Sequence, residues 1–522
     1  MNFSTIDIIV FIIYGVLIVS FGLWISREKK GHKKNSADYF LAGKALPWWA
    51  IGASLIASNI SAEQFIGMSG SGYALGLGIA SYEWIGGLTL IVVAKWLLPI
   101  FIEKKIFTLP QFLEIRYDSR IRTILAVFWV LLYTFVNLTS VLYLSSLALS
   151  VVLGISMTES IIGLAVVAVA YSIYGGLKAV AWTDVIQVVF LVIGGLVTTY
   201  LALDAVGNGS GALVGFQTLL EKAPDKFDLI LSRDNPYFSD LPGISVLIGG
   251  LWIANISYFG CNQYIIQRAL AAKSIGEAQK GLAFAGYLKL ILPLIVVIPG
   301  IAALVLEADI VRNDEAYPWL LGNLVPVGIK GLTFAALIAA ALSSLSSMMN
   351  STATIFTLDI YKPFVNPNAE ETKLVAVGRL VGLVAITIAV LVAQPLLGRE
   401  EQVFQFIQKY TGYVSPGIVV LFLFGLFWKR TTATGALWAA IASVPFSIGI
   451  DLAFPQMPFL NQMGVVFLAL SVLIFIISTL SPEKISPKAI QLNPNVFKTS
   501  PVFNGLAMGI ILILAALYAM FW

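Results

Sequence analysis

Long apolar runs separated by short polar stretches are the dominant pattern along the chain. Each run is close to the roughly 20 residues that an α-helix needs to cross a bilayer. Membrane barrel strands need only about 10 residues of alternating polarity, so these runs predict helices. Fourteen membrane helices are expected, at residues 4–26, 46–76, 78–102, 121–153, 157–174, 178–203, 243–266, 277–306, 329–357, 374–396, 402–428, 432–453, 459–480 and 501–521.

The composition agrees with an all-α polytopic membrane protein. Hydrophobic residues make up 58% of the 522 residues and charged residues 11%, whereas globular proteins carry about 45–50% and about 25%. One cysteine, Cys261, and one histidine, His32, leave little to build a disulfide or a metal cluster. A net charge of +4 does not indicate a nucleic-acid partner. With no nucleophile and base paired in the helices, an enzyme is not expected.

Lysine and arginine gather in alternate loops, including residues 27–34, residues 104–122 and a stretch around Arg268. Basic loops face the cytoplasm. The predicted location is therefore the cell (inner) membrane, crossed many times, with both termini external. The expected regions are a first peripheral helix with a cytoplasmic loop (1–45), helices two to six (46–204), an external loop (205–242), helices seven to eleven (243–428) and three peripheral helices (429–522).

Two of the expected helices contain polar interruptions. The second carries SNISAEQ at 58–64 and the seventh carries ANISYFG at 254–260, so the triplet Asn-Ile-Ser recurs 196 residues later. Paired breaks in corresponding positions of two halves are typical of transporters with inverted repeats and a binding site near the membrane midplane. The alternative is a pair of kinked helices without a transport role.

Charged and amide side chains at membrane depth are candidates for function. Glu83, Asp184 and Lys289 lie inside apolar helices, where a charge costs at least ~2.5–3.5 kcal/mol. Glu83 and Lys289 could also form a purely structural ion pair. In the eleventh helix, Gln405 and Gln408 continue a three-residue spacing that begins at residue 402, and such amides suit hydroxyl-rich solutes.

Oxygen ligands for a hard cation occur where the first break is expected to meet the ninth helix. That helix carries SSLSS at 343–347. Sodium prefers oxygen ligands, as calcium and magnesium do, and the first break would free the carbonyls of Ala57 and Ile60. Serine also favours close helix packing, which is the alternative account of the run.

Several motifs together resemble the solute:sodium symporter family, and most closely its bacterial sodium/galactose members. They are DYFLAGK at 38–44, IGMSG at 66–70, YGGL at 174–177, WTDVIQ at 182–187, YTG at 410–412 and SPG at 415–417. The resemblance covers nearly the whole chain. It implies a leucine-transporter-like fold of two five-helix inverted repeats, each with a broken first helix, and sodium-driven alternating access.

The resemblance also implies a set of site residues. Matching positions in sugar-transporting members bind the sugar, close the pocket and hold sodium. The sugar ligands are Asn59, Gln64, Glu83, Asn255, Lys289 and Gln408; the gates are Met68, Tyr82, Tyr258 and Phe404; the sodium ligands are the carbonyls of Ala57, Ile60 and Ala340 and the hydroxyls of Ser343 and Ser344; a second sodium site matches Asp184, Ser346 and Ser347.

Two features separate this chain from the galactose-type pattern. Gly86 stands where those relatives have a sugar-contacting serine, which leaves the identity of the hexose open. Ser346 stands where the pattern has alanine, so either one or two sodium ions could be coupled. The expected function is sodium-driven import of a galactose- or glucose-like monosaccharide; the alternatives are another solute, such as a sugar acid, a polyol or another small polar metabolite, and a passive channel.

Overall fold

The computed structural model describes residues 3–25, 46–106 and 108–522. Within these ranges every regular element is a helix, apart from one bridge between Leu46 and Ala272. The all-helical prediction is confirmed. The DYFLAGK motif, His32 and the first basic loop lie outside the described residues.

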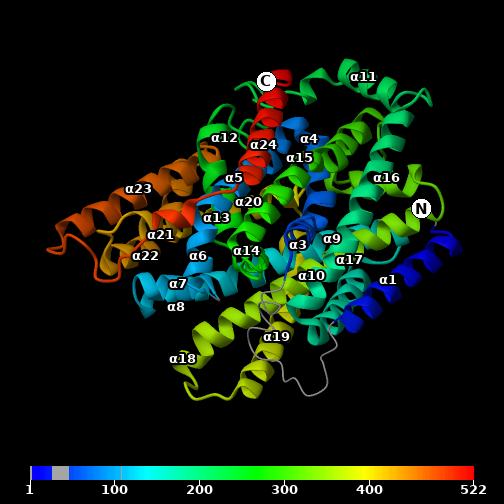
Figure 1. Ribbon diagram of the computed structural model, residues 1–522. Coiled ribbons are helices and arrows are strands. Elements are labelled where there is room, and N and C mark those ends of the chain that lie inside the picture. Colours follow the sequence, from blue (N-terminus) through cyan, green and yellow to red (C-terminus); the bar gives the residue numbers. More distant parts are fainter. Residues whose placement is uncertain (1–2, 26–45, 107) are drawn as a thin grey trace.

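The chain enters the structure with α1 (Thr5–Ile25) and continues through a long series of helices (Figure 1). As far as residue 222 they are α3 (Trp48–Asn59), η2 (Glu63–Met68), α4 (Ser69–Leu75), η3 (Leu77–Ala80), α5 (Ser81–Val92), η4 (Val93–Leu97), α6 (Leu98–Glu103), α7 (Leu109–Arg116), α8 (Ser119–Leu132), η5 (Tyr133–Leu138), α9 (Thr139–Leu153), α10 (Met157–Val206) and α11 (Ala212–Lys222).

The second half begins after the loop that follows α11, which includes the short η6 (Pro224–Lys226). Its elements are α12 (Ser245–Ile248), α13 (Gly250–Gly260), α14 (Gln263–Leu270), α15 (Ile275–Val305), η7 (Asn313–Glu315), α16 (Ala316–Leu324), α17 (Ile329–Ile355), η8 (Phe356–Tyr361), α18 (Lys362–Phe364), α19 (Glu371–Leu397), α20 (Val403–Gly412), α21 (Ser415–Phe427), α22 (Ala433–Ala453), α23 (Phe459–Leu480), η9 (Pro494–Phe497) and α24 (Pro501–Met520).

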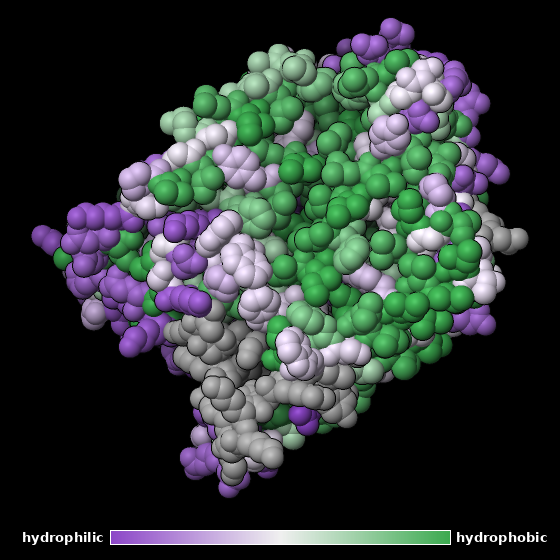
Figure 2. All heavy atoms as spheres, turned by 45° about the vertical axis from the view of Figure 1, so that its right-hand side comes forward, coloured by the Kyte–Doolittle hydropathy of each residue, from purple (hydrophilic) through white to green (hydrophobic). Residues whose placement is uncertain are grey.

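The described residues contain ten helical spans that are long and apolar enough to cross a membrane, and α20 with α21 adds an eleventh as a pair bent by 48°. The two broken helices, α3–α4 and α13–α14, and the short apolar stretch Met157–Ala170 correspond to the remaining expected segments. Figure 2 shows a broad apolar belt, with hydrophilic residues gathered toward the ends of the molecule. This distribution suits a bilayer.

The longest helical element joins two of the expected segments. The segments predicted at 157–174 and 178–203 lie in one element, α10, of 50 residues. The backbone of residues 174–177, expected to form a turn, is helical. This element is not straight: Gly163 and Leu164 from its first half line one cavity with Gln187 from its second half, so the two expected segments lie side by side. A capping box at its start, with the Ser156 hydroxyl accepting from the Glu159 N–H, satisfies the first turn.

Both ends of the described chain lie beside the same group of loops. The Asp7 carboxylate on α1 accepts hydrogen bonds from the N–H groups of Gly328 (2.7 Å) and Gly331 (3.0 Å), where α17 begins. The carbonyl of Phe521, just after α24, accepts from the N–H of Leu229 at 2.8 Å. The loop that follows α11 and the loop before α17 therefore share one face with the two ends.

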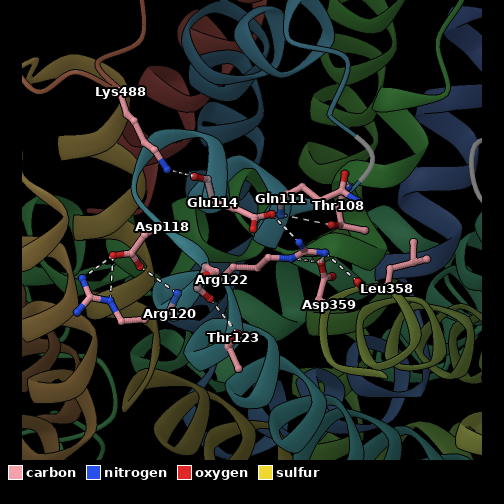
Figure 3. Close-up of polar contacts among 11 residues, drawn as sticks. Thr108, Gln111, Glu114, Asp118, Arg120, Arg122, Thr123, Leu358, Asp359 and Lys488 are labelled. Atoms are coloured by element: carbon pink, nitrogen blue, oxygen red, sulfur yellow. Dashed lines mark hydrogen bonds and ion pairs between the residues drawn. The ribbon is translucent and has the colours of Figure 1, made fainter. Parts of the chain in front are cut away.

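The opposite face is held together by arginines around α7 and α8. Arg122 joins Glu114 on α7 to Asp359 on η8, with an Arg122 to Asp359 distance of 2.7 Å (Figure 3). The Arg116 guanidinium is fully buried and donates to the carbonyls of Gly425 and Thr431. Both arginines belong to the second of the predicted basic stretches, residues 104–122. Their contacts show that they also connect helices to one another.

Candidate functional site

The first break lies between α3 and η2, within the polar run expected from the sequence. Ile60 leaves the helical conformation with ψ of 82°. In a continuous helix, the N–H groups of Ser61 and Gln64 would donate to the carbonyls of Ala57 and Ile60. They donate instead to the carbonyls of Asn59 and Ser61. The break therefore releases the two carbonyls that were expected to hold sodium.

The second break lies slightly later than expected. Residues 254–260 belong to α13, and the interruption falls at Cys261 and Asn262. The Asn255 amide donates to the carbonyl of Leu251 within the same helix, so its polar group does not disturb the helix. Tyr133 holds the break: its hydroxyl donates to the Asn262 side chain at 2.7 Å and accepts from the Gln263 N–H at 3.0 Å.

A cavity lies between the two breaks. All six expected sugar ligands line it, together with three of the four expected gate residues, Tyr82, Tyr258 and Phe404. The fourth, Met68, is fully buried in η2 and does not line the cavity. Five further polar residues line the cavity that were not among the expected ligands or gates: Glu63, Asn137, Asn262, Thr411 and Ser415.

A buried ion pair crosses the cavity wall. Lys289 on α15 is 1% exposed and donates to the Glu83 carboxylate on α5, which is 3% exposed. The Lys289 ammonium also lies 5.0 Å from the ring centre of Phe259. Both charges border the cavity, so they can meet a solute as well as each other.

Aromatic side chains close the cavity on two sides. The rings of Tyr82 and Phe404 meet edge to face, with centres 5.4 Å apart. On the other side, the Tyr258 hydroxyl accepts hydrogen bonds from the Asn59 amide (3.1 Å) and from the Tyr264 hydroxyl (2.7 Å). The contact between Asn59 and Tyr258 links the first broken helix directly to the second.

The serines of α17 face the first break. The Ser344 hydroxyl donates to the carbonyl of Ser58 at 3.2 Å, and Ala340 is fully buried one turn earlier on the same helix. Ser343 donates to the Asp184 carboxylate. The released carbonyls and the α17 hydroxyls fit a small hard cation.

A second buried cluster surrounds Asp184 and contains Arg268, which was expected to lie in a basic loop. Arg268 on α14 is only 1% exposed. Its guanidinium lies 3.5 Å from the Asp184 carboxylate and donates to the Ser347 hydroxyl at 2.8 Å. Ser346 is buried beside them on α17. The guanidinium therefore supplies the positive charge at the expected second sodium site.

A buried acidic side chain lies between α4 and the start of α20. Asp314 on η7 is 1% exposed and accepts from the N–H of Val403 at the start of α20 at 3.1 Å. Its other oxygen lies so near Gly70 on α4 that a Cβ there would come within 2.4 Å of it. Burial raises the pKa of Asp314 to about 8. The buried position of Asp314 in this structure therefore favours the protonated acid.

The described part of the chain contains no group of three or more His, Cys, Asp or Glu side chains suited to a metal ion. The oxygen ligands at the first break and on α17 are of a different kind, because most of them are carbonyls and hydroxyls. Such neutral oxygens suit an alkali cation better than a transition metal.

Comparison with known proteins agrees with this architecture. Residues 39–443 match the family described as "Sodium:solute symporter family". The chain is 55% identical to the "Sodium/glucose cotransporter" of Vibrio parahaemolyticus, covering 99% of this chain and 98% of that protein. It is 34% identical to the human "Sodium/myo-inositol cotransporter 2", covering 84% of this chain and 68% of that protein.

A solved structure agrees as well. The outward-open, substrate-bound form of a Na+-coupled sialic acid symporter has a TM-score of 0.79 and 26% identity, covering 94% of this chain and 100% of that one. The leucine-transporter-like fold expected from the sequence is confirmed. The chain belongs to the sodium:solute symporter family.

Proposed function

We propose that this sodium-coupled symporter imports a neutral monosaccharide of the galactose or glucose kind by alternating access. The observation that carries the proposal is the cavity between the two breaks, which combines amides, a buried ion pair and aromatic walls. Amides can donate hydrogen bonds to sugar hydroxyls and accept them, and a carboxylate can accept them. The identity to a protein named a sodium/glucose cotransporter adds support.

The proposed sugar ligands come from six elements around the cavity. Hydrogen bonds to charged groups are the stronger ones, worth ~1.5–3 kcal/mol each, so Glu83 and Lys289 would contribute most. The proposed ligands are Asn59 and Gln64 at the first break, Glu83 on α5, Asn255 on α13, Lys289 on α15 and Gln408 on α20.

The proposed gates act in turn. Tyr258 stacks on the inner face of the sugar, while Tyr82 and Phe404 close the outer face. Met68, buried behind the cavity, would take part only through the packing of η2. Tyr258→Ala should weaken sugar retention and raise the KM for uptake; unchanged uptake in this variant would remove the stacking role.

The proposed sodium ligands connect the ion to the conformation of the site. They are the carbonyls of Ala57, Ile60 and Ala340 and the hydroxyls of Ser343 and Ser344, which belong to the first broken helix and to α17. A sodium ion bound by both elements stabilises the conformation in which they are in contact. The size of the shift toward this conformation depends on how much more tightly sodium binds it than the other conformations. Sodium binding would thus prepare the sugar pocket.

A second sodium at Asp184, Ser346 and Ser347 would require the Arg268 guanidinium to withdraw, because that group already lies among these oxygens. We therefore propose one coupled sodium for the arrangement seen here. We also propose that both termini are external, which the basic loops on the opposite side support. The family consists of transporters, and we propose no enzymatic reaction for this chain.

A polyol is the second candidate solute. It is supported by the 34% identity to sodium/myo-inositol cotransporters. Competition for the binding of labelled galactose in saturating sodium tests the choice, with galactose, glucose, myo-inositol and galacturonate as competitors. Galactose or glucose is expected to compete best. Stronger competition by myo-inositol would favour the polyol, and no galactose binding would overturn the sugar assignment.

A further inference from the structure

Glu63 is a charged cavity residue that has no role among the proposed ligands. It is the first residue of η2, directly after the first break, and it is 5% exposed. It lines the same cavity as Glu83 and Lys289. The cavity thus contains two carboxyl groups and only one basic group among its lining residues.

The Glu63 side chain is not held by the surrounding protein. Its Oε1 atom is buried and has no hydrogen-bond partner among the described residues. Leaving a buried carboxyl oxygen unpaired is unfavourable, so such an atom in a natural site calls for an explanation. The neighbouring Ser61 hydroxyl accepts from the Glu63 backbone N–H at 3.2 Å and does not pair with the side chain.

The other charged groups of the cavity do not satisfy Glu63. The Lys289 ammonium donates to the Glu83 carboxylate on α5. Asn59 donates its amide to Tyr258, and Tyr258 accepts a second hydrogen bond from Tyr264. None of these contacts uses the Glu63 carboxyl, and a hydroxyl of a solute in the cavity can supply the donor that its buried oxygen lacks.

We propose that Glu63 is a further solute-binding and specificity-determining residue, which accepts a hydrogen bond from a hydroxyl of the bound solute and selects neutral, hydroxyl-bearing solutes over anionic ones. This inference rests on the proposed sugar transport. With Glu63 ionised the lining carries a net charge of −1, and with Glu63 protonated it carries none. In neither state does it attract the carboxylate of a sugar acid, and an ionised Glu63 repels it.

Binding of galactose and of galacturonate to purified full-length protein in saturating sodium tests the inference. Glu63→Gln preserves the shape of the side chain and removes its charge. We expect it to weaken galactose binding about 10-fold, since a charge-assisted hydrogen bond is lost. We expect the preference for galactose over galacturonate to fall by at least about 10-fold.

A matched control is Glu159→Gln, which changes a carboxylate that caps α10 outside the cavity. It should leave both affinities unchanged. If Glu63→Gln does not fold, Glu63→Asp serves instead: it keeps the charge, shortens the reach, and should weaken galactose binding while galacturonate stays excluded.

The outcomes separate this inference from the proposed function. Wild-type protein that binds galactose, with a Glu63→Gln variant of unchanged affinity and unchanged preference, would overturn the role of Glu63 alone. Wild-type protein that binds galacturonate as well as galactose would overturn the selectivity. Wild-type protein that binds neither solute would contradict the proposed sugar transport itself.

Discussion

The ion pair between Glu83 and Lys289 allows structural and functional roles to be separated by double substitution. Both residues are at most 3% exposed. Removing one partner of a buried pair leaves a charge without compensation and costs about 3–5 kcal/mol, whereas replacing both partners by neutral groups is often close to neutral. Lys289→Met should therefore lower the free energy of unfolding by about 3–5 kcal/mol, and adding Glu83→Gln should restore most of it.

Sugar binding should respond differently. If both side chains hold the sugar, the double variant recovers stability but loses two charge-assisted hydrogen bonds. Each is worth ~1.5–3 kcal/mol, so even one of them corresponds to about a 10–150-fold increase in the dissociation constant. Denaturant unfolding in detergent measures the stability, and equilibrium binding of labelled galactose in saturating sodium measures the affinity.

Two results would refute this reasoning. A double variant that binds galactose as the wild type does would make the pair purely structural, which is the alternative that the sequence leaves open. A Lys289→Met variant that unfolds at the wild-type denaturant concentration would show that the buried Glu83 charge is compensated by other groups.

Three further predictions concern the surroundings of the cavity. In Gly86→Ser the new Cβ would come within 3.1 Å of the Asn255 side chain. The added hydroxyl should change the ratio of galactose affinity to glucose affinity about 2–10-fold. An unchanged ratio would contradict a contact between this hydroxyl and the solute. Arg268→Gln should cost about 3–5 kcal/mol of stability by leaving Asp184 uncompensated, with recovery in Arg268→Gln/Asp184→Asn; denaturant unfolding that detects no loss would count against the pair. Because burial raises the pKa of Asp314 to about 8 in the closed arrangement, and exposure on opening would return it toward ~4, protonation favours the closed form. Uptake should therefore fall as external pH falls from 8 to 6, and Asp314→Asn should abolish this dependence; a wild-type rate that is flat over this range would refute it.

Much of the fold could be predicted because its signals are local. Apolar runs of spanning length indicate helices whatever surrounds them, and the polar run at 58–64 marks the first break. The second break was misplaced by a few residues, because Asn255 can satisfy its amide inside a helix. Its true position depends on Tyr133, a residue 129 positions before Asn262, whose contact no local pattern reveals.

The charged residues inside apolar helices could be predicted from the sequence, whereas several other residues of the site could not. Glu83 and Lys289 are conspicuous because charges are rare in apolar helices. Arg268 was missed because an arginine at the end of an inner half-helix has the same appearance in a sequence as one in a basic loop. Asn137 lies in the π-helical turn η5 of an otherwise apolar helix, and only the packing of α20 and α13 around it makes it part of the cavity.

Uptake of labelled galactose and glucose into liposomes that contain the purified protein tests the central claim most directly. One sodium ion moving down ~100 mV and a tenfold gradient supplies about 3.7 kcal/mol. One coupled sodium could thus support roughly 500-fold accumulation of the sugar, and the accumulated sugar should leave when an ionophore collapses the gradient. Sugar that only equilibrates across the membrane, at the same rate with and without sodium, would contradict sodium-coupled transport and indicate a passive channel.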